Sequence, residues 1–303
     1  MMAAVVVLAG GTGGAKLARG MLDVVGDDLT VIANTADDIE IYGSYVSPDP
    51  DLCSFWLADR IDERGWGLRD DSFAVMDALR ELGDDVWFRL GDRDLAIAIQ
   101  RSRRMSEGAR LTETLAELGA ALGLRARVLP MSDDPVRTWV LTDDGWSAFQ
   151  EFMIRARGQG RIEDVQLRGI DDAQATPEVL DAIACADAIV VGPSNPVISI
   201  GPILAIAGMR QALIDSRAPV VAVSPVVAGA VLKGPTQAFM RWAGHGLDGD
   251  SIAEYYEGLI DGLVADEPAG GVPVLRTDTL MEGAEGRRRV AAETLRFAEG
   301  LRR

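Results

Sequence analysis

The chain has 303 residues, of which 48% are hydrophobic and 25% charged, as in an ordinary globular enzyme. Its 47 acidic residues outnumber its 30 basic ones, and the resulting net charge of −17 excludes a nucleic-acid-binding surface of the usual basic kind. No apolar run is long enough to span a membrane, no signal peptide is recognisable, and Cys53 and Cys185 lack metal-ligand spacing. We therefore expect a cytoplasmic protein with free, buried thiols.

The first predicted strand, Val5–Ala9, runs directly into a glycine-rich segment, and helical periodicity follows over 15–25. At such a junction, main-chain N–H groups and the positive end of a helix converge on an anion. The segment matches neither GxGxxG nor a Walker A motif. It predicts a phosphate-binding loop, the alternative being a turn that only packs the helix close to the sheet. The candidate ligands are Gly10, Gly11, Thr12, Gly13, Gly14 and Lys16.

Polar and acidic residues follow the second predicted strand, Leu29–Ala33. Asn34 comes first, then Asp37 and Asp38, and a second acidic pair, Asp49 and Asp51, stands in a Ser-Pro-Asp-Pro-Asp segment. Two acidic pairs near a strand end are typical of a magnesium site that substrate phosphate oxygens complete. The alternative is that the first pair caps a helix and the second belongs to an ordinary turn.

Residues 52–124 are predicted to form a helical insertion over the sheet, with helices at 73–82 and 111–122 and one short strand at 86–90. Within it, Gly91, Asp92 and Arg93 precede an apolar helical run. Arg93 could clamp a phosphate or carboxylate. Equally, Asp92 could cap the helix, with Arg93 in a weak local ion pair.

The second half of the chain repeats the alternation of strand and helix. Strands are predicted at 125–129, 139–142, Ala188–Val191 and Val220–Val223, and helices at 177–183, 202–214 and 251–263. Met131-Ser-Asp-Asp again places acids at a strand end, and 138–155 alternates as an antiparallel pair does. The tail, 286–303, reads as a solvated amphipathic helix.

A second loop of interest follows the strand Ala188–Val191. Two prolines restrict it, and it carries polar side chains that suit a nucleotide base or a phosphate, although a purely structural turn is the alternative. Its candidate ligands are Gly192, Ser194, Asn195, Pro196 and Ser199. Lys233, one of only two lysines, follows the strand Val220–Val223 in a Leu-Lys-Gly-Pro context and is a further phosphate candidate.

Strands that alternate with helices predict an α/β fold: a Rossmann-like, doubly wound, mostly parallel sheet with a helical insertion. We expect residues 1–303 to form a single α/β domain. In such folds ligands bind at the carboxyl ends of the strands, where the candidate loops lie.

Seven motifs in order, from residue 5 to about 235, closely resemble the CofD/FbiA family, the 2-phospho-L-lactate transferases of coenzyme F420 biosynthesis. They are AGGTGGAKL, NTADD, SPDPD, GDRDLA, MSDD, FQEF and GPSNPVISIGPIL. The resemblance implies a magnesium-dependent enzyme and a homodimer. Its donor is a guanosine diphosphate-linked three-carbon acid, which carries 2-phospholactate, phosphoenolpyruvate or phosphoglycerate. The phospho-acid unit passes to the ribityl hydroxyl of the deazaflavin Fo, so that GMP leaves and F420-0 forms.

The resemblance also implies roles for the candidate residues. Asp37 and Asp38 would be catalytic and would hold Mg²⁺ with Asp49 and Asp51. Asn34 and the loops 10–16 and 192–199 would hold the donor, with Lys16 and Lys233 across the cleft from one another. The acceptor would lie under the insertion near 91–94. This chain has Tyr42 where the family usually has histidine, in a region expected to face the acceptor.

A competing class is a regulatory protein. The YvcK-type gluconeogenesis factors share a glycine-rich first loop and an Asp-Asp second junction, and they resemble nucleotide-sugar sensors without catalysis. They typically continue the Asp-Asp pair with Gly-Gly-Ser-Ser-Gly, whereas residues 39–43 here read Ile-Glu-Ile-Tyr-Gly. This difference, together with GDRDLA and FQEF, favours the transferase.

Overall fold

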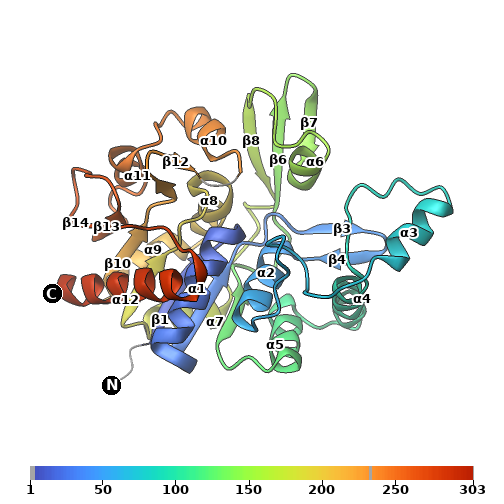
Figure 1. The fold of residues 1–303 in the computed structure, drawn as a ribbon, viewed down its shortest axis with the longest axis horizontal. Helices are drawn as coiled ribbons and strands as arrows, with labels where there is room; N and C mark the ends of the chain where they lie inside the picture. Colours follow the sequence, from blue (N-terminus) through green and yellow to red (C-terminus); the bar gives the residue numbers. More distant parts are fainter. Residues whose placement is uncertain (1–3, 232–233, 303) are drawn as a thin grey trace.

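A seven-stranded parallel sheet forms the centre of the protein (Figure 1). The computed structural model describes residues 4–231 and 234–302. Every neighbouring pair of strands is parallel, which confirms the predicted Rossmann-like, doubly wound fold. In spatial order the strands are β14 (Val274–Arg276), β13 (Gly262–Ala265), β10 (Val220–Val223), β9 (Ala188–Val191), β1 (Val5–Ala9), β2 (Leu29–Ala33) and β5 (Arg127–Pro130).

The strand order reverses between β1 and β9. From β1 the chain proceeds outward to β2 and β5, and it then returns to β9 on the other side of β1 and proceeds to β10, β13 and β14. At such a switch point the loops after the two central strands diverge and leave a crevice at the carboxyl edge of the sheet. The glycine-rich loop and the proline-rich loop follow these two strands.

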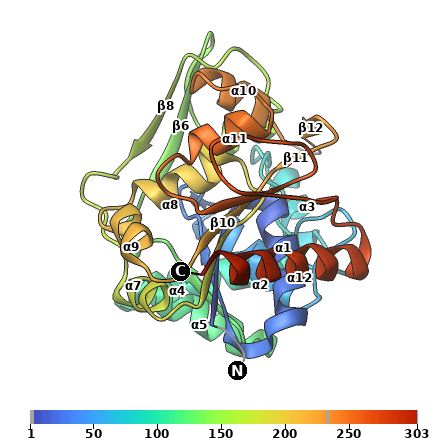
Figure 2. The ribbon, with the colours of Figure 1, turned by 90° about the vertical axis from the view of Figure 1, so that its left-hand side faces the viewer.

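Helices cover both faces of the sheet, and the strands are therefore apolar on both sides. Along β1, Val6 and Leu8 enter one core and Val5 and Val7 the other. Figure 2 shows the two groups of helices on opposite sides of the sheet. One group is α1 (Gly11–Val25), α2 (Pro48–Leu57) and α12 (Gly283–Leu301); the other is α7 (Pro177–Ala184), α8 (Gly201–Ala205) and α9 (Met209–Asp215).

Part of the chain between β2 and β5 extends away from this body (Figure 1). After the hairpin of β3 (Ile39–Ile41) and β4 (Ser44–Val46) come α2, α3 (Ala74–Glu81), α4 (Asp92–Ser106) and α5 (Leu111–Leu122). A small separate core that includes Met76, Phe88 and Leu95 holds the extension together. The strand predicted at 86–90 is wrong, because this segment is irregular and instead supplies side chains to that core.

A separate antiparallel sheet in the order β7-β6-β8 lies beside the carboxyl edge of the central sheet. Its strands are β6 (Arg137–Thr142), β7 (Gly145–Ala148) and β8 (Asp164–Arg168), and the short helix α6 (Phe149–Ile154) follows β7 directly. The antiparallel pair predicted in 138–155 is therefore confirmed up to Ala148. The remaining elements are β11 (Val226–Val227), β12 (Ala230–Val231), α10 (Thr236–Trp242) and α11 (Gly249–Tyr255), the 3-10 turn Gly26–Asp28 and the π-helical turn Pro196–Ile200.

Two helix predictions are wrong because glycine interrupts an otherwise helical apolar pattern. The helix predicted at 202–214 is broken near Gly208, whose φ is +82°. The one predicted at 251–263 ends at Tyr255, and Gly262 begins β13. A Cβ on Gly262 would lie 2.7 Å from Phe297 of α12, so the glycine there permits close packing of strand and helix. Of the two thiols expected to be buried, Cys53 is buried and Cys185 is exposed.

Within the described ranges, no helix has the length and apolarity needed to cross a membrane.

Candidate functional site

A cleft of about 560 Å³ lies at the switch point, along the carboxyl ends of the central strands. The loops after β1 and β9 form two of its walls, and the segment after β14 and the end of α6 form others. Of the predicted residues it is lined by Gly10, Gly11, Thr12, Gly13, Lys16, Asp37, Asp49, Ser194, Asn195 and Ser199. Lys233 lies outside the described residues.

Glycines are needed in the first loop because the second loop packs directly on it. The N–H of Gly10 donates to Ser194 Oγ at 3.2 Å. A Cβ on Gly13 would lie 2.1 Å from the carbonyl oxygen of Pro193, and one on Gly14 would lie 2.6 Å from Ser194 Oγ. The packing interpretation of these glycines is thus correct, and it is compatible with anion binding. Gly10, the N-cap residue of α1, has no side chain to cap the helix, and Asp49 accepts a hydrogen bond from the N–H of Gly11. The N–H groups that follow in the first turn remain for an anion at the cleft wall.

The second loop is rigid and presents amide hydrogens. Asn195 Oδ1 accepts hydrogen bonds from the N–H groups of Val197 and Ile198, at 3.0 and 3.3 Å. Its Nδ2 is buried without a hydrogen-bond partner among the described residues. A buried donor that lines a cleft without a partner marks a place where a ligand oxygen can bind. Pro196 is buried behind it, and Gly192 packs against β1 rather than lining the cleft.

Each of the two acidic pairs is divided by the fold. Asp37 and Asp49 line the cleft, whereas Asp38 and Asp51 do not. The second pair is not in an ordinary turn, because residues 48–51 form the first turn of α2. Positions two apart on a helix point to different sides, and adjacent residues in a turn diverge in the same way. The structure therefore brings together one acid of each pair rather than all four.

Asp49 is fixed by two hydrogen bonds at the start of α1. Its Oδ1 accepts from the N–H of Gly11 at 2.7 Å, and its Oδ2 accepts from Asn34 Nδ2 at 3.0 Å. Burial raises its pKa to about 6. Burial and the charge of Asp49 raise the pKa of Asp37 well above its usual range, and Asp37 Oδ1 is buried with no hydrogen-bond partner in the described chain.

This pair of carboxylates fits a divalent cation. A shared cation stabilises two neighbouring buried acids when the charge of one raises the pKa of the other, and the oxygen of Asp37 without a partner in the described chain is an available ligand. Magnesium is commonly held by one or two carboxylates together with substrate phosphate oxygens. Among residues 4–231 and 234–302, no three His, Cys, Asp or Glu side chains gather closely enough to hold a metal by themselves.

The other two acids belong to a buried network beneath the cleft. Asp38 accepts hydrogen bonds from Tyr45 Oη at 2.8 Å and Ser47 Oγ at 2.9 Å, and burial raises its pKa to about 7. Asp51 forms an ion pair with Arg101, whose side chain is only 2% exposed. These contacts join β4, α2 and α4 and hold the segment that carries Asp49.

A second cavity, of about 440 Å³, opens between α2 and the segment before α4. Its walls are aromatic, from Phe55, Trp66, Trp87 and Phe88. It is lined by two further acids, Asp51 and Asp94, and burial raises the pKa of Asp94 to about 7. Among the described residues, this cavity and the cleft share two lining residues, Asp49 and Gln150. We name the place where they meet the junction.

Of the GDRD segment, only Asp94 lines this cavity, and the three residues before it have structural contacts instead. Asp92 accepts hydrogen bonds from the N–H groups of Ala74 and Val75, each at 3.0 Å, so it caps α3. Gly91 packs against Asp71, which in turn accepts from the N–H of Arg93. Gly91, Asp92 and Arg93 line neither the cleft nor the aromatic cavity.

Tyr42 stands behind the aromatic cavity rather than in its wall. It occupies the turn of the β3–β4 hairpin with a φ of +52°. Its hydroxyl accepts a hydrogen bond of 3.3 Å from the N–H of Phe88. It therefore positions an aromatic wall residue from the side away from the ligand space.

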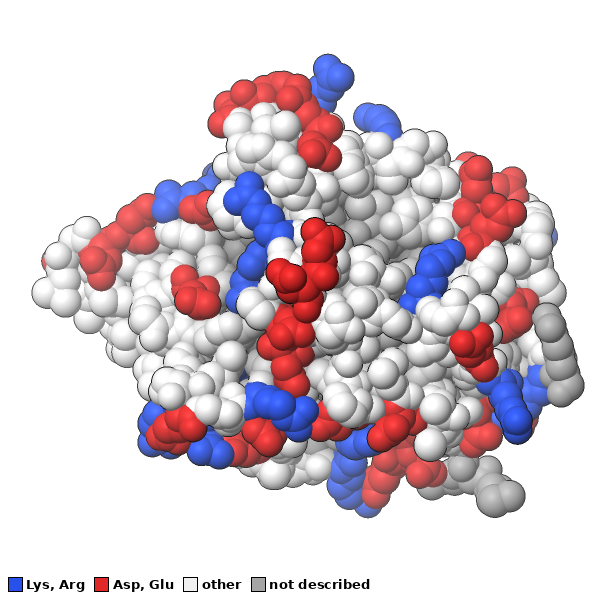
Figure 3. Space-filling view, turned by 180° about the vertical axis from the view of Figure 1, so that it is seen from behind, with Lys and Arg blue, Asp and Glu red and all other residues white. Residues whose placement is uncertain are grey.

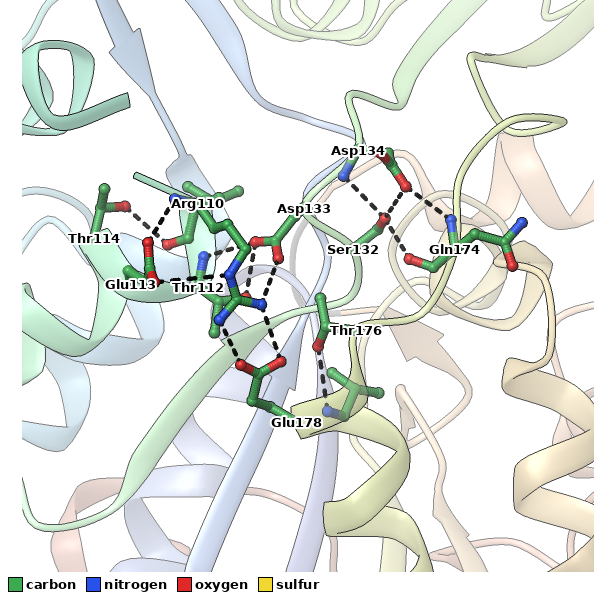
Figure 4. A network of polar contacts seen from close by, with 12 residues as sticks. Arg110, Thr112, Glu113, Thr114, Ser132, Asp133, Asp134, Gln174, Thr176 and Glu178 are labelled. Carbon is green, nitrogen blue, oxygen red and sulfur yellow. Dashed lines mark hydrogen bonds and ion pairs between the residues drawn. The ribbon is translucent and has the colours of Figure 1, made fainter. Parts of the chain in front are cut away.

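The acids of MSDD are structural (Figure 4). Asp133 Oδ1 accepts from both the N–H and the hydroxyl of Thr112, each at 2.8 Å, at the start of α5. Asp134 Oδ2 accepts from the N–H of Gln174 at 3.0 Å. Both contacts bind loops and helix ends together, and neither acid lines the cleft or the aromatic cavity.

Several lining residues are not among the candidates from the sequence. Gln150 stands in the FQEF motif without a predicted role there, and no site was predicted from the four aromatic residues of the second cavity. A concentration of aromatic residues over 55–88, within a chain that is only 6% aromatic, was the available signal. Surface charge does not mark a binding site on the face that Figure 3 shows, because acidic and basic side chains are interspersed there.

The fold and the site define a class: a Rossmann-like α/β protein in which a cleft with phosphate-binding features meets an aromatic cavity at a pair of buried carboxylates. The chain belongs to the family of 2-phospho-L-lactate transferase CofD, whose model matches residues 5–294. It is therefore a transferase of that type.

Named relatives match over nearly their whole length. A 2-phospho-L-lactate transferase of Methanosarcina mazei is 38% identical over 94% of this chain and 97% of its own. A phosphoenolpyruvate transferase of Kitasatospora aureofaciens is 39% identical over 98% of each chain. Two crystal structures of a Bacillus halodurans protein of the UPF0052 family have TM-scores of 0.64 and 0.62. They are 19% and 18% identical and cover 99% and 97% of this chain and 99% of their own, so the likeness shows the fold alone.

Proposed function

We propose that this protein transfers a phospho-three-carbon-acid unit from a guanosine diphosphate-linked donor to the ribityl hydroxyl of the deazaflavin Fo, with Mg²⁺ bound. GMP is released and F420-0 forms. The observation that carries the proposal is the junction, where a cleft suited to a diphosphate and a cavity suited to a flat aromatic ligand meet beside Asp49. A transfer between two substrates needs both reacting groups at one such place.

The donor fits the cleft with its diphosphate at the start of α1. The first-turn N–H groups of α1 after Gly11 and the amide of Asn195 would donate to phosphate oxygens. Asp37 and Asp49 would hold Mg²⁺, which neutralises phosphate charge when bound. The deazaflavin ring fits between the aromatic walls of the second cavity, which directs its ribityl chain to the junction.

The reaction forms one bond and breaks one. The ribityl hydroxyl oxygen attacks the phosphorus that bears the acid, and the bond between that phosphorus and the bridging oxygen breaks. GMP leaves with the bonding electron pair, and the hydroxyl proton passes to a carboxylate at the junction. Asp49 is the carboxylate that lines both cavities, which makes it the proposed acceptor of this proton.

The direct test is incubation of the protein with Fo, Mg²⁺ and each of three guanosine diphosphate-linked acids, with product masses measured. We expect F420-0 or its close analogue with at least one donor. Asp49→Asn should lower kcat by about 100-fold or more, whereas the exposed control Asp172→Asn should not. Unchanged turnover of Asp49→Asn at saturating Mg²⁺ would contradict the role of Asp49.

Ligand-induced stabilisation separates this enzyme from a nucleotide-sugar sensor. A ligand at 100 times its dissociation constant stabilises the folded state by about 2.7 kcal/mol. GDP and Fo should each raise the melting temperature, and UDP-sugars should not. A response to UDP-sugars alone would favour the regulatory class instead.

A further inference from the structure

Gln150 lines the junction together with Asp49. It is the second residue of α6, whose neighbouring side chains line different spaces: Phe149 and Met153 line the cleft, and Ile154 lines the aromatic cavity. Only Asp49 and Gln150, among the described residues, line both. A ligand chain that passes from the aromatic cavity to the cleft therefore passes beside these two side chains.

The orientation of the Gln150 amide is fixed by its one hydrogen bond. Its Nε2 donates to the main-chain carbonyl oxygen of Asp37 at 3.1 Å. Because a carbonyl oxygen only accepts, the nitrogen must face Asp37 and Oε1 must point the other way. None of the described residues donates to this Oε1. The junction therefore holds a neutral acceptor fixed in place, beside two carboxylates.

A neutral acceptor and a carboxylate can each accept a hydrogen bond from a different hydroxyl of the same substrate. The reacting hydroxyl has one proton, which must be directed at the carboxylate that receives it. A second acceptor at the junction must then bind a different hydroxyl, and the hydroxyl on the neighbouring carbon lies nearest. A polyol chain with hydroxyls on adjacent carbons satisfies both groups together, whereas a simple alcohol leaves Gln150 unpaired.

We propose that Gln150 is a positioning residue that selects an acceptor with vicinal hydroxyls. Its Nε2 holds the main chain of Asp37, and its Oε1 accepts a hydrogen bond from the hydroxyl next to the reacting one. This inference rests on the function proposed above, and it assigns to that function a residue that determines which acceptor chains react.

The test combines a protein change with an acceptor change. The variant is Gln150→Met, which keeps the length of the side chain without its hydrogen bonds, and the control is Gln159→Met at an exposed position. Each protein is assayed with Fo and with an Fo analogue that lacks the hydroxyl beside the terminal one. Thermal shift with GDP measures folding and donor binding separately.

We expect Gln150→Met to lower kcat/KM for Fo by about 10- to 100-fold, with its melting temperature and its response to GDP unchanged. For the deoxy analogue the loss should be at least ten times smaller, because the partner of Oε1 is already absent. Equal losses with both acceptors would mean that Gln150 only holds Asp37 and would overturn the selection.

If Gln150→Met does not fold, Gln150→Asn gives the same comparison, because its side chain is too short to reach the neighbouring hydroxyl. A wild-type protein that transfers nothing to Fo overturns the proposed function and this inference with it, whereas an active wild type with an equally active Gln150→Met overturns only the inference.

Discussion

Arg101 is the cation on which the buried network beneath the cleft depends. Its side chain is 2% exposed, and its Nη1 donates to Asp51 Oδ2 at 3.1 Å and to the carbonyl oxygen of Tyr45 at 3.2 Å. Its charge also lowers the pKa of Asp38 and of Asp51, against the larger effect of burial, which raises both. Removal of Arg101 would leave two buried carboxylates with less compensation.

We expect Arg101→Met to lower the free energy of unfolding by about 3–5 kcal/mol at pH 8, as the loss of one partner of a buried ion pair does. This is a large share of the roughly 5–15 kcal/mol that stabilises a typical protein. The double variant Arg101→Met/Asp51→Leu should recover most of the loss, because it leaves no unpaired charge at this position. Comparison of the single and double variants separates the effect of the unpaired charge of Asp51 from the effect of the smaller side chain at position 101.

The loss should also depend on pH with a definite sign. Without Arg101 the folded-state pKa of Asp51 rises further above its unfolded value. The folded protein then binds more protons than the unfolded chain between these two values. The cost of the variant is therefore full above the folded-state pKa and decreases as the pH falls toward 4. Urea unfolding of both proteins at pH 8, 6 and 5 measures this, and a loss below about 1 kcal/mol that does not change with pH would refute the reasoning.

Three further variants test the second cavity and the glycine loop. Asp94→Asn should stabilise the protein by up to about 4 kcal/mol at pH 8, because burial raises the pKa of Asp94 to about 7 from its ordinary value of 3.8. The gain should shrink as the pH falls toward 4, and urea unfolding that shows no gain at pH 8 would contradict the burial of an ionised carboxylate there. Gly13→Ala should cost about 1–3 kcal/mol and weaken GDP binding, because its Cβ would meet the carbonyl of Pro193 at 2.1 Å. Gly11→Ala, where φ is +63° but the space is open, should cost about 1–2 kcal/mol with less effect on binding.

The central sheet could be predicted because its strands are buried on both faces. A continuous apolar run such as Val5–Ala9 identifies a strand without help from its neighbours, and the ranges of β1, β2, β9 and β10 were correct. The edge strand β14 has only three residues and gives no clear apolar run, and the helix predicted at 251–263 runs into the start of β13. Gly262 in β13 depends on Phe297 of α12, a contact with no local signal.

The acidic candidates show where sequence spacing ceases to be informative. Asp37 and Asp38 are adjacent and Asp49 and Asp51 are close, so the sequence groups them as pairs. Side-chain direction within each pair is set by local backbone: a turn for the first and the start of α2 for the second. The signal for a helix was present, since Ser47 and Pro48 precede acids as they do at many helix starts. It predicts that Asp49 and Asp51 diverge, but not which of them faces the cleft.

That choice is made by contacts between parts of the chain that are distant in sequence. Asp49 is held by Gly11 at the start of α1 and by Asn34 at the end of β2, while Arg101 of α4 fixes Asp51 on the other side of α2. The same helix turn thus anchors the insertion on one side and supplies the cleft with a carboxylate on the other. A shift of the insertion relative to the sheet would move Asp49 away from α1 and separate the two cavities. For this reason the stability of the Arg101 network and the geometry of the junction should change together. Arg101→Met should therefore lower kcat, which depends on the junction, more than it lowers the affinity for GDP.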